Sequence, residues 1–301
     1  MSLIAFFGAL ESGLIYGLVA LGVLISFRTL DFPDLTADGS FPLGGAVAGI
    51  SIIAGINPWL ACAFGMLAGS AAGVVTAWLH VKLGILQLLA SILVMVALYA
   101  VNLRVMGSPN LPLLGEKTIF SALVTPENGF WMRCLIVGAV VLAAKLLLDW
   151  FYNTETGLSM RATGSNLRMA QAQGINTSWM TVTGMAISNG LIALGGAIFV
   201  QTQGGVSIDI GIGTIVIGLA AVIIGETIIP AKRIWLITLA VIVGAVLYKL
   251  FIQVALSSET LRDIGFGPQD VNLITALLVV IALVLPKIKT KFLKRNVRAY
   301  K

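Results

Sequence analysis

Long runs of apolar residues, separated by short polar segments, dominate the chain. The runs lie at 3–27, 41–56, 58–79, 83–106, 131–152, 180–202, 211–230, 234–256 and 271–286. A helix needs about 20 apolar residues to cross the hydrocarbon core of a bilayer, and nearly every run is that long. The ten-residue alternation typical of transmembrane β-barrel strands is absent. The pattern therefore predicts an all-α integral membrane protein, a polytopic bundle of about eight or nine transmembrane helices.

The second apolar run is short, and the segment before it is unusual. Residues 30–42 read LDFPDLTADGSFP, so that Asp31, Asp34 and Asp38 stand among two prolines and a glycine. A helix must break here, because proline cannot continue one. Broken helices in transporters line the solute path, which predicts a broken or re-entrant segment. An ordinary turn with hydrated carboxylates is the alternative.

Further polar side chains lie in or beside the apolar runs. Such groups are costly inside a membrane and usually face protein or water. The candidate substrate pathway comprises Asp31, Asp34, Asp38, Asn102, Asn189, Gln201, Gln203 and Asp209. These groups suit an amino acid, a sugar or a nucleoside, so the sequence leaves the solute class open.

Composition agrees with a membrane protein. The 301 residues are 58% hydrophobic and 11% charged, with a mean hydropathy of +1.00. A soluble domain carries about a quarter charged residues, so a soluble enzyme is excluded. The net charge of +6 belongs to one tail, since residues 287–301 hold seven basic residues and no acid. Without an interleaved basic and aromatic groove, this tail indicates a cytoplasmic membrane anchor and no nucleic-acid partner.

The basic residues also predict the orientation, because Lys and Arg concentrate on the cytoplasmic side. With the tail inside, the cytoplasmic side holds 14 Lys and Arg and the other side five. We therefore expect a cytoplasmic C-terminus and an extracytoplasmic N-terminus, with residues 107–130 outside and 153–179 inside. The whole chain, 1–301, is expected to form a single transmembrane domain.

The inside loop at 153–179 contains a candidate short helix. Ser165 or Asn166 can cap its start, and Gly174 can end it. Such a helix is either a surface connector or a docking element for a cytoplasmic partner.

The usual marks of an enzyme are missing from the sequence. There is no G-x-x-x-x-G-K-[ST] phosphate-binding loop and no Ser/His/Asp set, and the one histidine is His80 at a predicted span end. We therefore expect no catalytic activity and no bound cofactor or metal. Glycines at four-residue spacing, Gly65, Gly69 and Gly73, instead indicate close helix packing, more within the chain than between subunits.

The inside loop and the following span resemble the coupling region of ABC-importer permeases of the branched-chain amino acid and ribose type. The matching positions are Gly157, Arg161, Ala162, Ala170, Gly174, Ile175 and Asn176, followed by Ala193, Gly195 and Gly196. GLAAVIIGE at 218–226 and PQDVNLITALLVVIALVLPKI at 268–288 are similar to later segments of the family. The segment DFPDLTADGSFPLGG departs from the family's usual pattern and looks like tryptophan/tyrosine-type or uncharacterised members.

The resemblance implies a permease subunit in a bacterial inner membrane that moves a small polar solute by alternating access. It implies these partners: two ABC ATPase subunits that hold ATP and Mg²⁺, a second permease copy (identical or a paralogue), an extracytoplasmic substrate-binding protein and membrane lipid. The implied ATPase contact comprises Gly157, Arg161, Ala162, Arg168, Ala170, Gly174, Ile175 and Asn176. For Arg161 the alternative is that it braces the loop at the headgroup level.

An amino acid, branched-chain or aromatic, is the expected solute, with a sugar or nucleoside as the alternative. A secondary transporter or channel is the alternative of another class.

Overall fold

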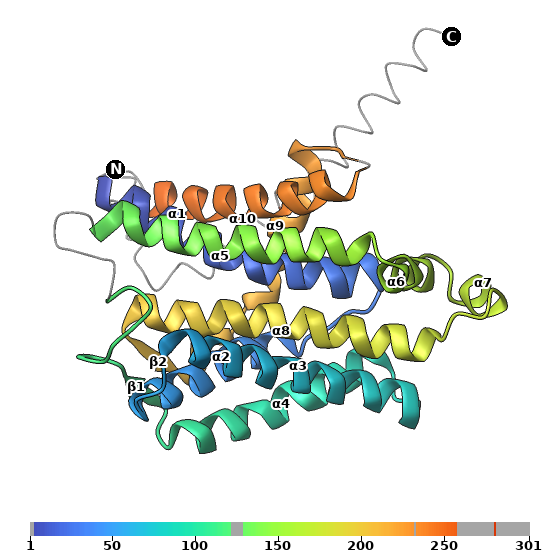
Figure 1. Cartoon of the computed structure of the whole chain (residues 1–301), viewed down its shortest axis with the longest axis horizontal. Coiled ribbons are helices and arrows are strands. Elements are labelled where there is room, and N and C mark those ends of the chain that lie inside the picture. Colours follow the sequence, from blue (N-terminus) through green and yellow to red (C-terminus); the bar gives the residue numbers. More distant parts are fainter. Residues whose placement is uncertain (1–2, 122–128, 232, 258–279, 281–301) are drawn as a thin grey trace, which may run out of the picture.

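A computed structural model describes residues 3–121, 129–231, 233–257 and 280. The elements, in order, are α1 (Leu3–Val23), the π-helix η1 (Leu24–Thr29), α2 (Ala37–Ile53), α3 (Pro58–Leu83), α4 (Gln87–Met106), β1 (Asn110–Pro112), α5 (Gly129–Tyr152), α6 (Glu155–Ser165), α7 (Leu167–Ala172), α8 (Thr177–Gln203), β2 (Gly205–Ser207), the 3₁₀ helix η2 (Ile208–Gly211), α9 (Thr214–Ile228) and α10 (Ile234–Ser257). The long helices lie side by side in a bundle (Figure 1).

Seven helical segments of the described chain are long and apolar enough to cross a membrane, and α2 is a shorter apolar helix. They match the first eight predicted runs, with ends that differ by a few residues. The largest shifts are of four residues, at the start of α2, the end of α3 and the start of α4. The ninth predicted run, 271–286, and the basic tail at 287–301 lie outside the described residues, apart from Val280.

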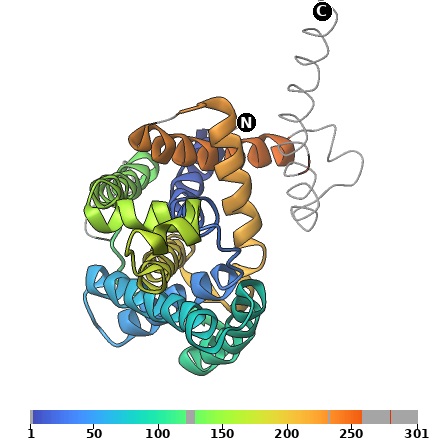
Figure 2. The same cartoon turned by 90° about the vertical axis from the view of Figure 1, so that its right-hand side faces the viewer.

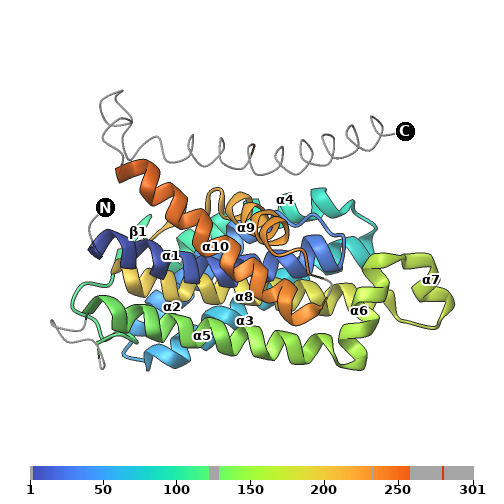
Figure 3. The same ribbon diagram turned by 90° about the horizontal axis from the view of Figure 1, so that it is seen from above.

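Two helices form the interior of the bundle. The most buried of the candidate spans are α8 and the continuous segment that α1 and η1 form together. The view along the bundle places them inside a ring formed by the other long helices (Figure 2). From above, α10 crosses α1 obliquely (Figure 3), and these two helices pack closely.

Glycines allow the close approach of α3 to α8 and α2. A Cβ atom on Gly73 would overlap the carbonyl oxygen of Met185, and one on Gly69 would overlap that of Asn189. A Cβ on Gly65 would stand 2.7 Å from the carbonyl oxygen of Gly44. The glycine triple therefore serves packing within the chain, as its spacing predicted.

All six tryptophans lie at helix ends and are between 47% and 69% exposed. Trp59 and Trp131 stand at the starts of α3 and α5, at one end of the bundle. The others, at the opposite end, are Trp78, Trp150, Trp179 and Trp235. Exposed tryptophan rings collect at membrane–water interfaces, so these two groups mark the two boundaries of the membrane-spanning part.

A short two-stranded antiparallel sheet, which the sequence did not predict, closes the first of these ends. Strands β1 and β2 pair antiparallel, with Leu111 opposite Val206. The segment after β1 folds onto the bundle, where Ile119 and Phe120 are almost fully buried. The strands were missed because they are three residues long and pair across 95 positions of sequence.

The start of α1 and the β1–β2 sheet lie at one end of the bundle, and α6 and α7 lie at the other (Figure 1). The start of α1 and the 153–179 loop thus lie at opposite ends of the bundle, which agrees with the orientation predicted from the basic residues. Which end faces the cytoplasm stays a prediction of that count.

Candidate functional site

The predicted helix break lies deep inside the bundle. After η1 the chain continues without helical hydrogen bonding and re-enters a helix only at Ala37, so that α2 begins within the body of the protein. Asp34 in this break is 1% exposed. Its Oδ1 accepts a hydrogen bond from the Thr36 backbone at 2.9 Å, and its Oδ2 accepts one from Asn189 Nδ2 at 2.7 Å. The carboxylate is thus held between the break and α8.

Two more side chains of the break extend this network. Ser40 Oγ donates to Asn189 Oδ1 at 2.7 Å, so both ends of the Asn189 amide are used. The hydroxyls of Thr36 and Thr76 lie 2.8 Å apart and connect the break to α3. Buried polar groups are stable when they are fully hydrogen-bonded, and this network fixes the break against two helices.

Asp38, in the first turn of α2, lies at the N-terminus of α9. Its Oδ1 accepts from the Ile215 backbone N–H at 2.8 Å and its Oδ2 from that of Gly213 at 3.2 Å. The residue before α9 is Gly213, which has no side chain to cap the helix. Asp38 supplies the missing cap from 175 positions away, with a charge that suits the positive end of the helix dipole.

A cavity of about 360 Å³ opens beside Asp38. Its walls come from the start of α2, from α4 and from η2; the lining residues are Asp38, Gly39, Pro42, Met95, Val96, Tyr99, Asn102, Ile208, Asp209 and Ile212. Most of this lining is apolar. Asn102 is 1% exposed and donates from Nδ2 to the carbonyl oxygen of Gly39 at 3.2 Å. Its Oδ1 is buried and has no hydrogen-bond partner among the described residues.

The predicted pathway residues therefore fall into separate groups. Asp38, Asn102 and Asp209 line one cavity, whereas Asp34 and Asn189 belong to the packed network behind it. Gln201 is a brace: its Oε1 accepts from the Ile119 backbone N–H at 3.0 Å and its Nε2 donates to the Ala197 carbonyl. The remaining two residues line other pockets. Gln203 lies beside the β1–β2 sheet, and Asp31 lies at the opposite end of the bundle.

The cavity also contains residues that the sequence did not single out. Tyr99, Met95 and Val96 belong to an apolar span whose exposed face the sequence alone could not locate. Ser40 and Thr36 were also missed, because small hydroxyl residues are common in membrane helices and signal nothing until a partner is known.

The loop at 153–179 contains two short helices, where the sequence predicted one. Thr154 caps α6 by accepting from the Gly157 backbone N–H at 3.3 Å. Asn166, one of the two predicted caps, caps α7 by accepting from the Met169 backbone N–H at 3.0 Å. Gly174 has φ +80° just after α7, so the predicted glycine end is also confirmed.

The candidate coupling residues differ in exposure. Arg161, Ala162, Arg168, Gly174 and Asn176 are exposed. Others face the protein: Ala170 is 3% exposed, Gly157 packs against the end of α5, and Ile175 is half-buried.

Large apolar side chains on α7 are exposed to solvent. Leu167 is 52% exposed and Met169 is 62% exposed, at positions that project from the end of the bundle. Leu167, Arg168 and Met169 thus make the first half of α7 exposed.

A family model described as "Branched-chain amino acid transport system / permease component" matches residues 5–286. A tyrosine transport system permease protein of Clostridioides difficile is 37% identical over 289 residues, which cover 96% of this chain and 94% of the relative. An uncharacterized protein of Rickettsia prowazekii is 32% identical and covers 91% of this chain and 95% of its own.

Solved structures share the fold at low identity. An ABC transporter described as of the metal-chelate type, in an inward-facing conformation, gives a TM-score of 0.52 at 16% identity and covers 95% of this chain and 87% of its own. The PsaBC structure from Streptococcus pneumoniae gives the same TM-score at 14% identity, with 92% and 89% covered.

Proposed function

The chain belongs to the family of branched-chain amino acid transport permease components, and from that premise we propose that it carries an amino acid with an apolar or aromatic side chain through the bacterial inner membrane. Membership of this family favours an ABC importer over a secondary transporter or channel. The relative named as a tyrosine transport permease supports an amino acid over a sugar or nucleoside.

The observation that carries the proposal is the cavity at the helix break. Its two charged groups are acceptors, the Asp38 carboxylate and the exposed Asp209 carboxylate, and the buried Asn102 side chain lies in the wall beside them. Acceptors of this kind suit the ammonium group of an amino acid. The other walls, including Tyr99, Met95 and Ile212, suit an apolar or aromatic side chain. A sugar would need several donors as well, and the described lining offers few.

Energy for transport comes, in this proposal, from partners on the α6–α7 side. Two ATPase subunits that hold ATP and Mg²⁺ contact α7 through Leu167, Arg168 and Met169, whose side chains are free of the bundle. A second permease copy completes the pathway, and a binding protein delivers the solute at the end of the bundle that carries the β1–β2 sheet. The chain itself is expected to bind no cofactor, since it carries no phosphate-binding loop.

Transport in liposomes tests the proposal. The permease, its ATPase and its binding protein are reconstituted together, and uptake of labelled tyrosine, leucine and ribose is measured with and without ATP. We expect ATP-dependent uptake of an amino acid and none of ribose. Ribose uptake, or amino-acid uptake that proceeds without ATP, would refute the proposed solute or the proposed energy source.

A variant then connects the cavity to transport. Asn102→Leu keeps a side chain of the same branched shape but removes the buried Oδ1 acceptor and the hydrogen bond from Nδ2 to the Gly39 carbonyl, so uptake should fall several-fold while the complex remains assembled. Asn110→Leu is the matched control, because Asn110 lies in strand β1 and outside this cavity. Equal uptake by both variants would place the pathway elsewhere.

A further inference from the structure

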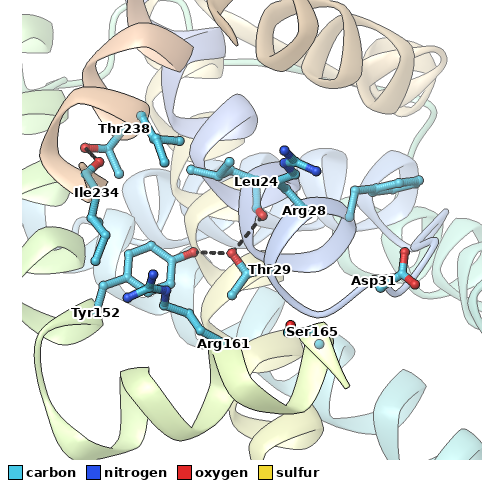
Figure 4. A pocket seen from close by; sticks show the side chains of 12 residues that line it. Leu24, Arg28, Thr29, Asp31, Tyr152, Arg161, Ser165, Ile234 and Thr238 are labelled. Atoms are coloured by element: carbon cyan, nitrogen blue, oxygen red, sulfur yellow. Dashed lines mark hydrogen bonds between the residues drawn. The ribbon is translucent and has the colours of Figure 1, made fainter. Parts of the chain in front are cut away.

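A second polar pocket, of about 410 Å³, lies at the α6–α7 end of the bundle (Figure 4). It is formed between η1, the end of α5, α6 and the start of α10. The lining residues are Leu24, Phe27, Arg28, Thr29, Asp31, Tyr152, Arg161, Gly164, Ser165, Ile234, Ile237 and Thr238. The sequence predicted Arg161 as part of the ATPase contact and Asp31 as part of the substrate pathway, but the transport proposal above gives neither residue a role.

Two charged side chains of the pocket have no partner among the described residues. Arg161 reaches from α6 towards Tyr152, whereas Asp31 stands well apart from it beyond η1 (Figure 4). In the described part of the chain, neither side chain forms an ion pair or a side-chain hydrogen bond. Arg28 differs, because its Nε lies 2.9 Å from Glu226 Oε1 and its charge is compensated. The pocket thus presents one available cation and one available anion.

Hydroxyl groups also line the pocket, and that of Thr29 lies between the two charges (Figure 4). The Thr29 Oγ1 and the Tyr152 hydroxyl are 2.8 Å apart, and Thr238 Oγ1 donates to Asp149 at 2.7 Å, so these groups already have partners. Ser165 lines the pocket next to Arg161 on α6, one helical turn further along. Arg161 and Ser165 can therefore donate together to the oxygens of one anionic group.

The pocket lies at the level of the membrane boundary. Trp150, two residues before Tyr152, is 69% exposed, and Trp235, next to Ile234, is 50% exposed. Both belong to the group of tryptophans that marks this boundary. Apolar lining residues, Phe27 and Ile237 among them, continue from the polar part towards the hydrocarbon core. A ligand here meets charges at the headgroup level and apolar surface below them.

The backbone holds Asp31 in an uncommon conformation. Its φ is +53°, which makes it the only residue other than glycine with positive φ in the described part of the chain. Asp and Asn tolerate this region better than other side chains do. A residue that keeps such a conformation is held there by its surroundings, and Asp31 lines the pocket from this position.

We propose that this pocket binds the headgroup of a zwitterionic phospholipid of the phosphatidylethanolamine type. Arg161 and Ser165 bind the phosphate, Asp31 binds the ammonium group, and the apolar residues contact the start of the acyl chains. The ligand links η1, α6 and α10, so it stabilises the attachment of the α6–α7 loop to the bundle. The proposal requires that this end lies at a headgroup layer and is independent of the transported solute.

Lipid binding to the full purified chain in detergent tests the proposal. Native mass spectrometry counts retained lipid as phosphatidylethanolamine, phosphatidylglycerol or phosphatidylcholine is titrated. We expect phosphatidylethanolamine to bind most tightly, and Arg161→Gln to weaken it about tenfold, the effect of losing one charge-assisted hydrogen bond. Arg233→Gln is the matched control: Arg233 is exposed at the same end but does not line the pocket, so this variant should bind as the wild type does.

A second variant tests the ammonium half. Asp31→Asn keeps a residue that tolerates positive φ, so the chain should fold, but the preference for phosphatidylethanolamine over phosphatidylglycerol should disappear. Retained preference in this variant, or equal losses in Arg161→Gln and Arg233→Gln, would overturn the proposal. Soluble phosphoethanolamine shares the headgroup chemistry. If it displaces the lipid at millimolar concentration, the site belongs to a soluble ligand and the assignment to lipid is wrong.

Discussion

The core formed by α2, α3 and α8 differs from the α6–α7 loop in how it is held together. In the core, backbones touch at glycines such as Gly69 and Gly73, and Asp34 and Asn189 are joined in a buried hydrogen-bond network. In the loop, each short helix begins at its own cap, and large apolar side chains such as Met169 face solvent.

The difference separates two kinds of requirement. The core is closely packed around the break, so it can position the residues that line the cavity. The loop has few contacts with the bundle beyond α6 and offers an unpartnered face. We conclude that substitutions in the core act on stability, whereas substitutions on the loop act on coupling to a partner.

The largest effect is expected from Gly69→Ala. The added methyl group overlaps the Ala193 side chain and the Asn189 carbonyl, and such overpacking costs about 1–3 kcal/mol. The melting temperature of the purified chain, followed by tryptophan fluorescence, should fall by several degrees. Gly8→Ala is the control, since a Cβ there meets nothing within 4 Å. Equal melting temperatures for the two variants would show that the core is not tightly packed.

Asp34→Leu should have the next largest effect on stability. It removes the acceptor of Asn189 Nδ2 and of the Thr36 backbone, and leaving such buried donors unpaired costs about 1–3 kcal/mol. A double-mutant cycle with Asn189→Leu checks the origin of the loss, because the double variant should lose less than the two single losses combined. Additive losses would mean that the two side chains do not act on each other.

The effect of Gly174→Ala should be small on stability and large on coupling. A residue with a Cβ at φ +80° is strained by about 1–2 kcal/mol, and the strain distorts the end of α7. Solute-stimulated ATPase activity of the full complex should fall while the bundle melts almost unchanged. Gly55→Ala is a close control, because Gly55 has the same φ, the same open surroundings and a position at the opposite end. If both variants lose coupling equally, α7 has no special role.

Met169→Glu should change stability least, since that side chain is 62% exposed. A negative charge at this exposed position of α7 should still weaken the ATPase contact. Co-purification of the ATPase with the permease measures this contact. Unchanged co-purification would show that the partner binds elsewhere.

Apolar run length was enough to predict the bundle and the positions of eight helices, because about 20 apolar residues have few alternatives to a membrane span. The cap at Asn166 and the glycine after α7 were also predictable, since both signals are local. The β1–β2 sheet and α6 could not be predicted, because these elements are short and lack a hydrophobic period.

The candidate site was predicted only as a set of polar residues. Which of them meet depends on packing: Asp38 caps a helix 175 positions away, and Asp34 pairs with a side chain 155 positions away. Asp31 stands three residues from Asp34 but lines the pocket at the α6–α7 end, whereas Asp34 is buried in the hydrogen-bond network. Sequence spacing carries no information on such contacts.

Solute protection of the cavity tests the central claim most directly. Both native cysteines in the described chain, Cys62 and Cys134, are buried, so a cysteine introduced as Tyr99→Cys should report with low background. In the reconstituted complex, a small water-soluble thiol reagent should label this position, and the transported amino acid should slow the labelling in at least one nucleotide state. Labelling that is insensitive to solute and nucleotide, or that occurs only with a lipid-soluble reagent, would place Tyr99 against lipid and contradict a solute pathway at the helix break.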